Sequence, residues 1–155
     1  MEFYKSLYFS KGGVFRYIVW FRIMQKVKQN KISKFILGLP VYIIHRHYEY
    51  KYGIHINTNI EVGEGLFIVH GDGVHLNCSK IGKNFTCYQG VTLGAGKNGI
   101  PLVCDNVTVY TNAVVVGNIT LNNNCSIGAN AFVSKDVPEN SVIAGIPAKI
   151  IKEKL

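Results

Sequence analysis

The stretch from residue 103 to residue 138 decides the fold, and in groups of six it reads VCDNVT VYTNAV VVGNIT LNNNCS IGANAF VSKDVP. Each group begins with Val, Leu or Ile, and its fourth residue is Asn in the first five groups and Asp in the last. A six-residue apolar period is typical of neither a helix nor an alternating strand. It predicts short, flat strands joined by tight corners, with one aliphatic side chain pointing inward from each face.

The polar fourth position of each six-residue group predicts where the corners lie. Asn and Asp tolerate the left-handed backbone conformation better than other non-glycine residues. We therefore expect corner residues at Asn106, Asn112, Asn118, Asn124, Asn130 and Asp136.

The same period extends upstream to Ile54, but it is interrupted twice. The spacing from Leu66 to Ile81 is fifteen residues, and from Leu93 to Val103 it is ten. The second spacing predicts about four extra residues in a loop at 95–100, where the sequence is rich in glycine. Interruptions of a regular coil indicate where a solenoid carries its functional site.

Residues 1–52 have a different character and form a basic, aromatic segment. Apolar spacing predicts one helix over 14–28 and a second over about 33–50, bent or broken around Gly38 and Pro40. The segment holds ten Lys and Arg against Glu2 and Glu49, which accounts for the whole net charge of +8. Either it covers one end of the solenoid, or it meets an anionic partner such as a membrane surface. It contains no motif for reading nucleic acid.

These patterns predict three parts: a helical segment at 1–52, a β-helix domain at 53–151 and a tail at 152–155. The four cysteines form no C-x-x-C pair and are expected to be reduced thiols of a cytoplasmic protein. Arg16 and Arg22 interrupt the first apolar stretch, which argues against a signal peptide. The apolar run at 35–44 is too short to span a bilayer, which takes ~20 residues. Any membrane contact is therefore expected to be peripheral, at the inner face.

Four motifs in a fixed order resemble the hexapeptide-repeat acyltransferases, specifically the serine acetyltransferase-like branch that includes O-acetyltransferases of polysaccharide biosynthesis. The motifs are Tyr52-Gly53-Ile54, then Val62-Gly63-Glu64-Gly65-Leu66 followed by His70, then Gln89-Gly90-Val91-Thr92-Leu93-Gly94, and Ala144-Gly145-Ile146-Pro147-Ala148-Lys149. The resemblance covers about residues 45–151. It implies a mainly β fold, a left-handed parallel β-helix with a short N-terminal α-helical segment. It also implies acetyl-CoA as co-substrate and a homotrimer with active sites between subunits.

Acetyl transfer to an alcohol needs a base for the hydroxyl proton, a donor for the oxyanion and a groove for the pantetheine arm. His70 matches the family's catalytic histidine and lies in the first interruption of the repeat. The family's supporting aspartate falls fifteen residues earlier, where this chain has His55. His55 itself is one candidate partner, Asp72 is another, and Glu64 is a weaker one. His75 is expected either to line the cleft or to be a solvated side chain.

The candidate residues for acetyl-CoA share small size or positive charge. Gly94, Ala95 and Gly96 would let a backbone amide approach the thioester closely, as only small residues can. Ala113 and Ala131 have small side chains, which would keep the neighbouring corners from filling a pantetheine groove. Lys149 resembles the family's basic residue near the CoA phosphates, and Lys135 is a second candidate.

The acceptor is predicted to be a saccharide hydroxyl, in surface polysaccharide biosynthesis. Serine acetyltransferases have an aspartate immediately before the catalytic histidine, where this chain has Val69. They have an Arg-His pair after the glycine loop, where residues 99–102 carry no cation. Both groups that would match an amino acid are therefore missing. Serine, in cysteine biosynthesis, remains the alternative acceptor.

Two alternative functions, from other functional classes, stay open. A non-catalytic trimeric scaffold would use the β-helix only to present the basic segment. A metal-dependent carbonic anhydrase of the same fold would use His70 and His75 as ligands, but a third histidine at a suitable distance is not evident. We therefore expect no metal site.

Overall fold

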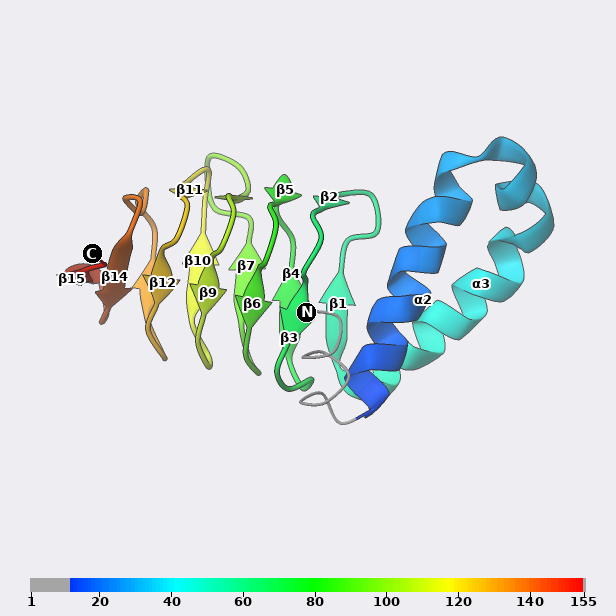
Figure 1. Cartoon of the computed structure of the whole chain (residues 1–155), viewed down its shortest axis with the longest axis horizontal. Coiled ribbons are helices and arrows are strands. Elements are labelled where there is room, and N and C mark those ends of the chain that lie inside the picture. Colours follow the sequence, from blue (N-terminus) through cyan, green and yellow to red (C-terminus); the bar gives the residue numbers. More distant parts are fainter. Residues whose placement is uncertain (1–11, 155) are drawn as a thin grey trace.

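The computed structural model describes residues 12–154, in which a helical hairpin leads into a solenoid of stacked coils (Figure 1). The hairpin consists of α2 (Gly12–Gln29) and α3 (Lys31–Tyr52). It lies at the β1 end of the stack, and the C-terminal strand lies at the other end (Figure 1).

Three sheets form the faces of the solenoid, and from β1 to β13 consecutive strands pass from one sheet to the next in the order A, B, C. Sheet A contains β1 (Ile54–Ile56), β4 (Val74–Leu76), β7 (Thr92–Gly94), β10 (Val114–Val116) and β13 (Phe132–Val133). Sheet B contains β2 (Glu61–Val62), β5 (Lys80–Ile81), β8 (Leu102–Val103) and β11 (Thr120–Leu121). Sheet C contains β3 (Phe67–Ile68), β6 (Thr86–Cys87), β9 (Thr108–Val109), β12 (Ser126–Ile127), β14 (Ser141–Ala144) and β15 (Lys149–Glu153). Neighbouring strands are parallel except the pair β14 and β15.

The six-residue period corresponds to one inward side chain per face. Val103, Val109 and Val115 come from sheets B, C and A in turn, and each is buried. The next coil repeats this order with Leu121, Ile127 and Val133. Stacking these residues builds one continuous apolar core, so the predicted solenoid is confirmed.

The corner prediction is right for four of the six positions. Asn106, Asn112, Asn124 and Asn130 have φ between 57° and 59°. Asn118 and Asp136 are not left-handed, because they follow sheet A, at the third corner of the triangle. There Gly117 has the positive φ, and the Asp136 carboxylate accepts a hydrogen bond from the Thr120 amide at 2.8 Å.

The second interruption is a loop after β7. Leu102 pairs with Lys80, 22 residues earlier, whereas Thr120 pairs with Leu102, 18 residues earlier. The four extra residues are those predicted at 95–100. A Cβ on Gly96 would lie 2.7 Å from the Gly117 Cα, so this glycine lets the loop pack directly on the next coil.

The helical hairpin is more regular than predicted. α3 runs unbroken through Gly38 and Pro40, so of the two predicted alternatives, a bend or a break, the break is wrong. Pro40 removes only one backbone donor, while Val41, the next residue, and His45, about one turn later, are buried and hold the helix in place. The Asn30 side chain caps the start of α3, and Gly53 ends it with φ 59°.

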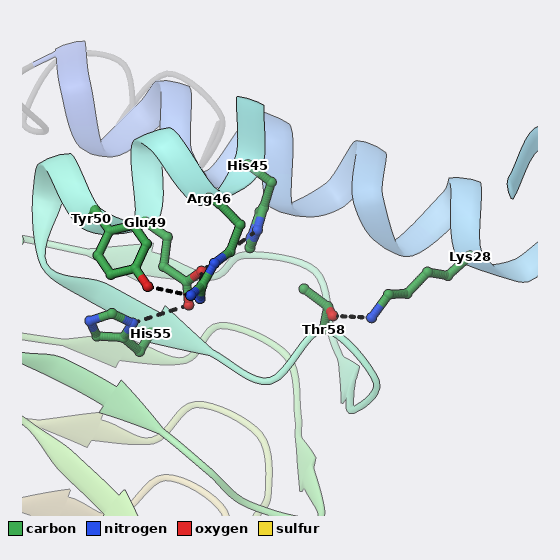
Figure 2. A network of polar contacts seen from close by, with 7 residues as sticks. All are labelled: Lys28, His45, Arg46, Glu49, Tyr50, His55 and Thr58. Carbon is green, nitrogen blue, oxygen red and sulfur yellow. Dashed lines mark hydrogen bonds and ion pairs between the residues drawn. The ribbon is translucent and has the colours of Figure 1, made fainter. Parts of the chain in front are cut away.

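Polar contacts fasten the hairpin to the first coil. The Arg22 guanidinium donates to the carbonyl oxygens of Val62 and Gly63, and Gln25 donates to the Ile60 carbonyl at 2.9 Å. The Lys28 ammonium donates to Thr58 (Figure 2). Part of the basic charge of the N-terminal segment is therefore used inside the molecule.

Candidate active site

A cavity of about 350 Å³ lies where the hairpin meets the first coils. His70, Gly71 and Asp72 line it together with Val69, the preceding residue. Its remaining lining residues are Gly13, Val14, Tyr52 and Gln89. The structure thus places His70 and Asp72 on one cavity, at the first interruption of the repeat.

The turn that carries His70 is held by its backbone. Asp72 has φ 68°, its amide donates to the Tyr52 carbonyl at 2.8 Å, and its carbonyl accepts from the Gly90 amide at 3.0 Å. A Cβ on Gly71 would lie 2.5 Å from the Tyr52 carbonyl oxygen. The turn is therefore wedged between the end of α3 and the next coil, and the exposed His70 side chain projects from a fixed support.

Gln89 is a cavity residue that sequence reasoning left outside the site. Its Oε1 is buried and has no hydrogen-bond partner within the described part of the chain. Buried acceptors are normally satisfied, so this atom is available to a donor in the cavity. The sequence signal that could have identified Gln89 is its place at the start of the motif at 89–94, one coil above the His70 turn.

The residues predicted to bind acetyl-CoA lie at opposite ends of the strands of sheet A. Gly94 ends β7, and Ala95 and Gly96 begin the loop beyond it. Ala113 and Ala131 come immediately before β10 and β13, at the amino-terminal ends of these strands, and their side chains are buried in the core. The structure does not bring these two groups together within one chain.

The backbone of the glycine loop is partly engaged. The Gly96 amide donates to the Gly99 carbonyl at 2.8 Å, so it is not free to meet an oxyanion in this conformation. Lys135 is an exposed residue between β13 and β14, and Lys149 is the exposed first residue of β15. Strand β14, which follows Lys135, and strand β15, which begins with Lys149, lie at the opposite end of the stack from the helical hairpin (Figure 1).

His55 lies outside the cavity lining and has a carboxylate partner that the sequence did not reveal. Its Nδ1 is 3.1 Å from Oε1 of Glu49, which reaches down from α3 (Figure 2). The His55 ring stacks on His75 of the next coil, with 4.7 Å between ring centroids. Neither Asp72 nor His70 forms a hydrogen bond with His55 in the part of the chain that the structure describes.

Burial shifts the pKa values of two groups near Glu49. His45 is buried against the rings of Tyr17 and Phe21, and loss of solvation lowers the pKa of its imidazole, while Glu49 partly opposes that shift. Burial also raises the pKa of the Tyr17 phenol, and Glu49 adds to that shift. Within residues 12–154, no three His, Cys, Asp or Glu side chains gather so as to hold a metal ion.

Comparison of sequences finds serine acetyltransferases. The chain is 39% identical to the serine acetyltransferase of Staphylococcus xylosus over 150 residues, which are 93% of this chain and 66% of the relative. It is also 39% identical to that of Staphylococcus aureus strain Mu50 over 142 residues, 87% of this chain and 64% of the relative. The chain therefore spans slightly less than two thirds of these relatives. No protein-family model matches it.

Comparison of structures agrees. The serine acetyltransferase of Brucella abortus superposes with a TM-score of 0.76 at 27% identity, covering 89% of this chain and 56% of that one. A serine acetyltransferase in complex with CoA gives 0.75 at 26% identity, with 90% and 57% covered. The enzyme of Neisseria gonorrhoeae in complex with serine gives 0.74 at 28% identity, with 88% and 55% covered.

Proposed function

Since this chain belongs to the serine acetyltransferase-like branch of the hexapeptide-repeat acyltransferases, we propose that it transfers an acetyl group from acetyl-CoA to a hydroxyl. The observation that carries the proposal is His70, which is exposed on a fixed turn and lines the same cavity as Gln89, whose buried acceptor is unsatisfied within the described residues. A scaffold would have no need of either feature.

In the proposed mechanism His70 acts as general base. Its neutral imidazole accepts the proton of the acceptor hydroxyl while the hydroxyl oxygen attacks the thioester carbon. The tetrahedral intermediate then collapses with cleavage of the carbon–sulfur bond, and the imidazolium returns the proton to the departing CoA sulfur. The products are an acetyl ester and free CoA, and no other reactant is needed.

We assign serine as the acceptor, because the relatives carry the name serine acetyltransferase and one structural neighbour was solved with serine. The comparisons give no support to the saccharide acceptor expected from the sequence. Two features of the chain still favour it as a second candidate. Val69 brings an apolar side chain into the cavity lining, and residues 99–102 carry no cation.

A homotrimer with active sites between subunits is part of the proposal. It would bring the glycine loop of one subunit towards the His70 cavity of another, since a single chain leaves the predicted acetyl-CoA residues dispersed. A cytoplasmic location is also part of the proposal. It is supported by acetyl-CoA as the co-substrate and by the cysteines, which are free in the structure.

Peripheral contact with an anionic membrane is the last part of the proposal, and the outer face of α3 supports it. We define this face as Ile32, Phe35, Ile36, Leu39 and Ile43, which are 57% to 92% exposed. Their spacing places them on one side of the helix, opposite the buried Val41 and His45. Lys31 is exposed and flanks this face, Lys34 is exposed on the side of the helix towards Lys28 of α2, and α3 has no acidic residue before Glu49. Such a surface suits anionic lipid better than a second copy of equal charge. No helix among residues 12–154 is long and apolar enough to cross a bilayer.

The proposed function is tested by the release of CoA thiol from acetyl-CoA with L-serine, sugars and sugar nucleotides as acceptors. We expect turnover with serine and a loss of about 10²–10⁴-fold in His70→Ala, the range for a general base. His47→Ala, which removes an exposed histidine of α3, is the matched control. Turnover only with a saccharide would move the acceptor to the second candidate. No turnover with any acceptor, or an unaffected His70→Ala, contradicts the proposal.

A further inference from the structure

We propose that Glu49 is a positioning residue that fixes His55 in one tautomer, so that the free Nε2 of His55 binds a hydroxyl of the acceptor. The inference rests on the proposed acetyl transfer and adds a residue to its acceptor site. It is carried by the contacts around Glu49, which Figure 2 shows.

Glu49 is an acid whose surroundings fix both of its oxygens. Its side chain is only 9% exposed, and Oε2 accepts from the Arg46 guanidinium at 2.7 Å. Oε1 faces Nδ1 of His55 at 3.1 Å. Burying a carboxylate is costly unless it is paired and hydrogen-bonded, so this arrangement holds the carboxylate in one orientation.

The carboxylate determines where the proton of a neutral His55 resides. An ionised carboxylate can only accept, so Nδ1 must be the protonated nitrogen. Nε2 is then left as an acceptor. A carboxylate that orients a histidine in this way is a recurring device for presenting the second nitrogen to a ligand.

The His55 ring is held on both sides and is still accessible. His75 stacks on it at 4.7 Å, and the ring of Tyr50 lies edge-on at 6.2 Å. Arg46 packs over the Tyr50 ring at 4.5 Å and donates to its hydroxyl, which holds Tyr50 in turn. The His55 side chain is 33% exposed, and its second nitrogen points away from Glu49 (Figure 2). The nitrogen is therefore oriented and open to a ligand.

The pair lies beside the candidate active site. His55 is three residues after Tyr52, whose side chain lines the cavity and whose carbonyl holds the His70 turn. His75 is paired with His55 across sheet A and follows that turn in the chain. His55 and His75 thus belong to the two strands of sheet A that adjoin this turn, and in the proposal an acceptor bound over His70 reaches them.

The first test separates orientation from mere packing by kinetics. His55→Asn keeps an amide donor for Glu49 but has no group at the Nε2 position, and Glu49→Gln removes the charge. In both variants we expect the KM for the acceptor to rise at least tenfold, equivalent to about 1.4 kcal/mol, with the KM for acetyl-CoA unchanged. His55→Gln, which places an amide near the Nε2 position, should lose less. Glu61→Gln, a change at an exposed acid paired with Lys80, should lose nothing.

The second test reads the tautomer directly and needs no turnover. Imidazole ¹⁵N spectra of the wild type should show His55 protonated at Nδ1, and Glu49→Gln should move part of the population to the other tautomer. Acceptor KM values within twofold of the wild type, or an unchanged tautomer, would overturn the inference while acetyl transfer stood. A wild type that acetylates no acceptor would instead refute the proposed function, and the inference with it.

Discussion

His45 is a buried histidine whose aromatic surroundings make the protein sensitive to acid. It is 3% exposed, and its Nε2 has no hydrogen-bond partner in the described residues. Burial lowers the pKa of the folded imidazole below the ordinary value of about 6.5 that the unfolded chain retains. The unfolded state therefore binds more protons at mildly acidic pH. Its contribution to stability is intact above pH 6.5 and is lost as the pH falls from there towards the folded pKa.

The pH dependence of unfolding tests this assignment. We expect the free energy of unfolding, measured by urea denaturation, to fall by up to about 1.4 kcal/mol per pH unit below pH 6.5 because of His45. His45→Phe keeps an aromatic ring against Tyr17 and Phe21 but cannot be protonated. The variant should show a flatter dependence than the wild type. Parallel curves for the two proteins would show that His45 is not the responsible group.

Single residues mark the limit of what the sequence predicts about the site. The sequence alone placed His70 and Asp72 in the candidate site, because a motif and an interruption of the repeat coincide there, and both residues line one cavity. Glu49 was not, since its contact with His55 depends on how Gly53 turns the chain from α3 into β1. The buried Oε1 of Gln89 likewise depends on the stacking of one coil on the next. Contacts of this kind are products of tertiary structure and leave no local pattern.

At the scale of the element, the outer face of α3 predicts binding to anionic vesicles. Phe35→Ser and Ile36→Ser each remove an exposed apolar side chain, 92% and 65% exposed, from a helix that is held by its opposite face. We expect each variant to bind phosphatidylglycerol vesicles several-fold more weakly in co-sedimentation, with the fold unchanged by circular dichroism. High salt should weaken binding further, because screening reduces the attraction of the lysines.

A matched control comes from β15. Ile151 is also 65% exposed, but its strand β15 lies at the other end of the solenoid (Figure 1), so Ile151→Ser should leave vesicle binding unchanged. Equal binding to neutral and anionic vesicles would contradict the electrostatic part of the proposal. Loss of self-association in Phe35→Ser, with no vesicle binding by the wild type, would assign the face to a second copy of the chain.

The elements themselves were predictable to different degrees. The strands were, because the six-residue period fixes which residue of each face points inward. The extent of α3 was also close to the prediction, but its continuity was not predictable, since Pro40 signals a bend or break while the packing of Val41 and His45 keeps the helix intact. The third corner was also misjudged, because Asn118 shares the spacing of the left-handed residues but follows a different sheet.

At the scale of the whole molecule, the cysteines provide probes spread along the solenoid. Cys78, Cys87 and Cys125 are fully buried in the core, whereas Cys104 is partly exposed. Burial raises the pKa of Cys78 to about 12 and that of Cys125 to about 11. Since only the thiolate reacts, these thiols are protected both by access and by protonation. Because each coil packs on the next, exposing them requires opening of the stack.

Alkylation followed by mass spectrometry tests this view of the stack as a cooperative unit. With iodoacetamide at pH 8 we expect one fast modification, at Cys104, and three slow ones that share a common rate set by opening. Cys104→Ser should abolish the fast phase and leave the slow phase as it was. Because Cys78 and Cys125 lie on different coils, separate rates for these two thiols would mean that the two ends of the solenoid open independently. The helical hairpin, which covers only the β1 end, would then protect the coils nearest to it.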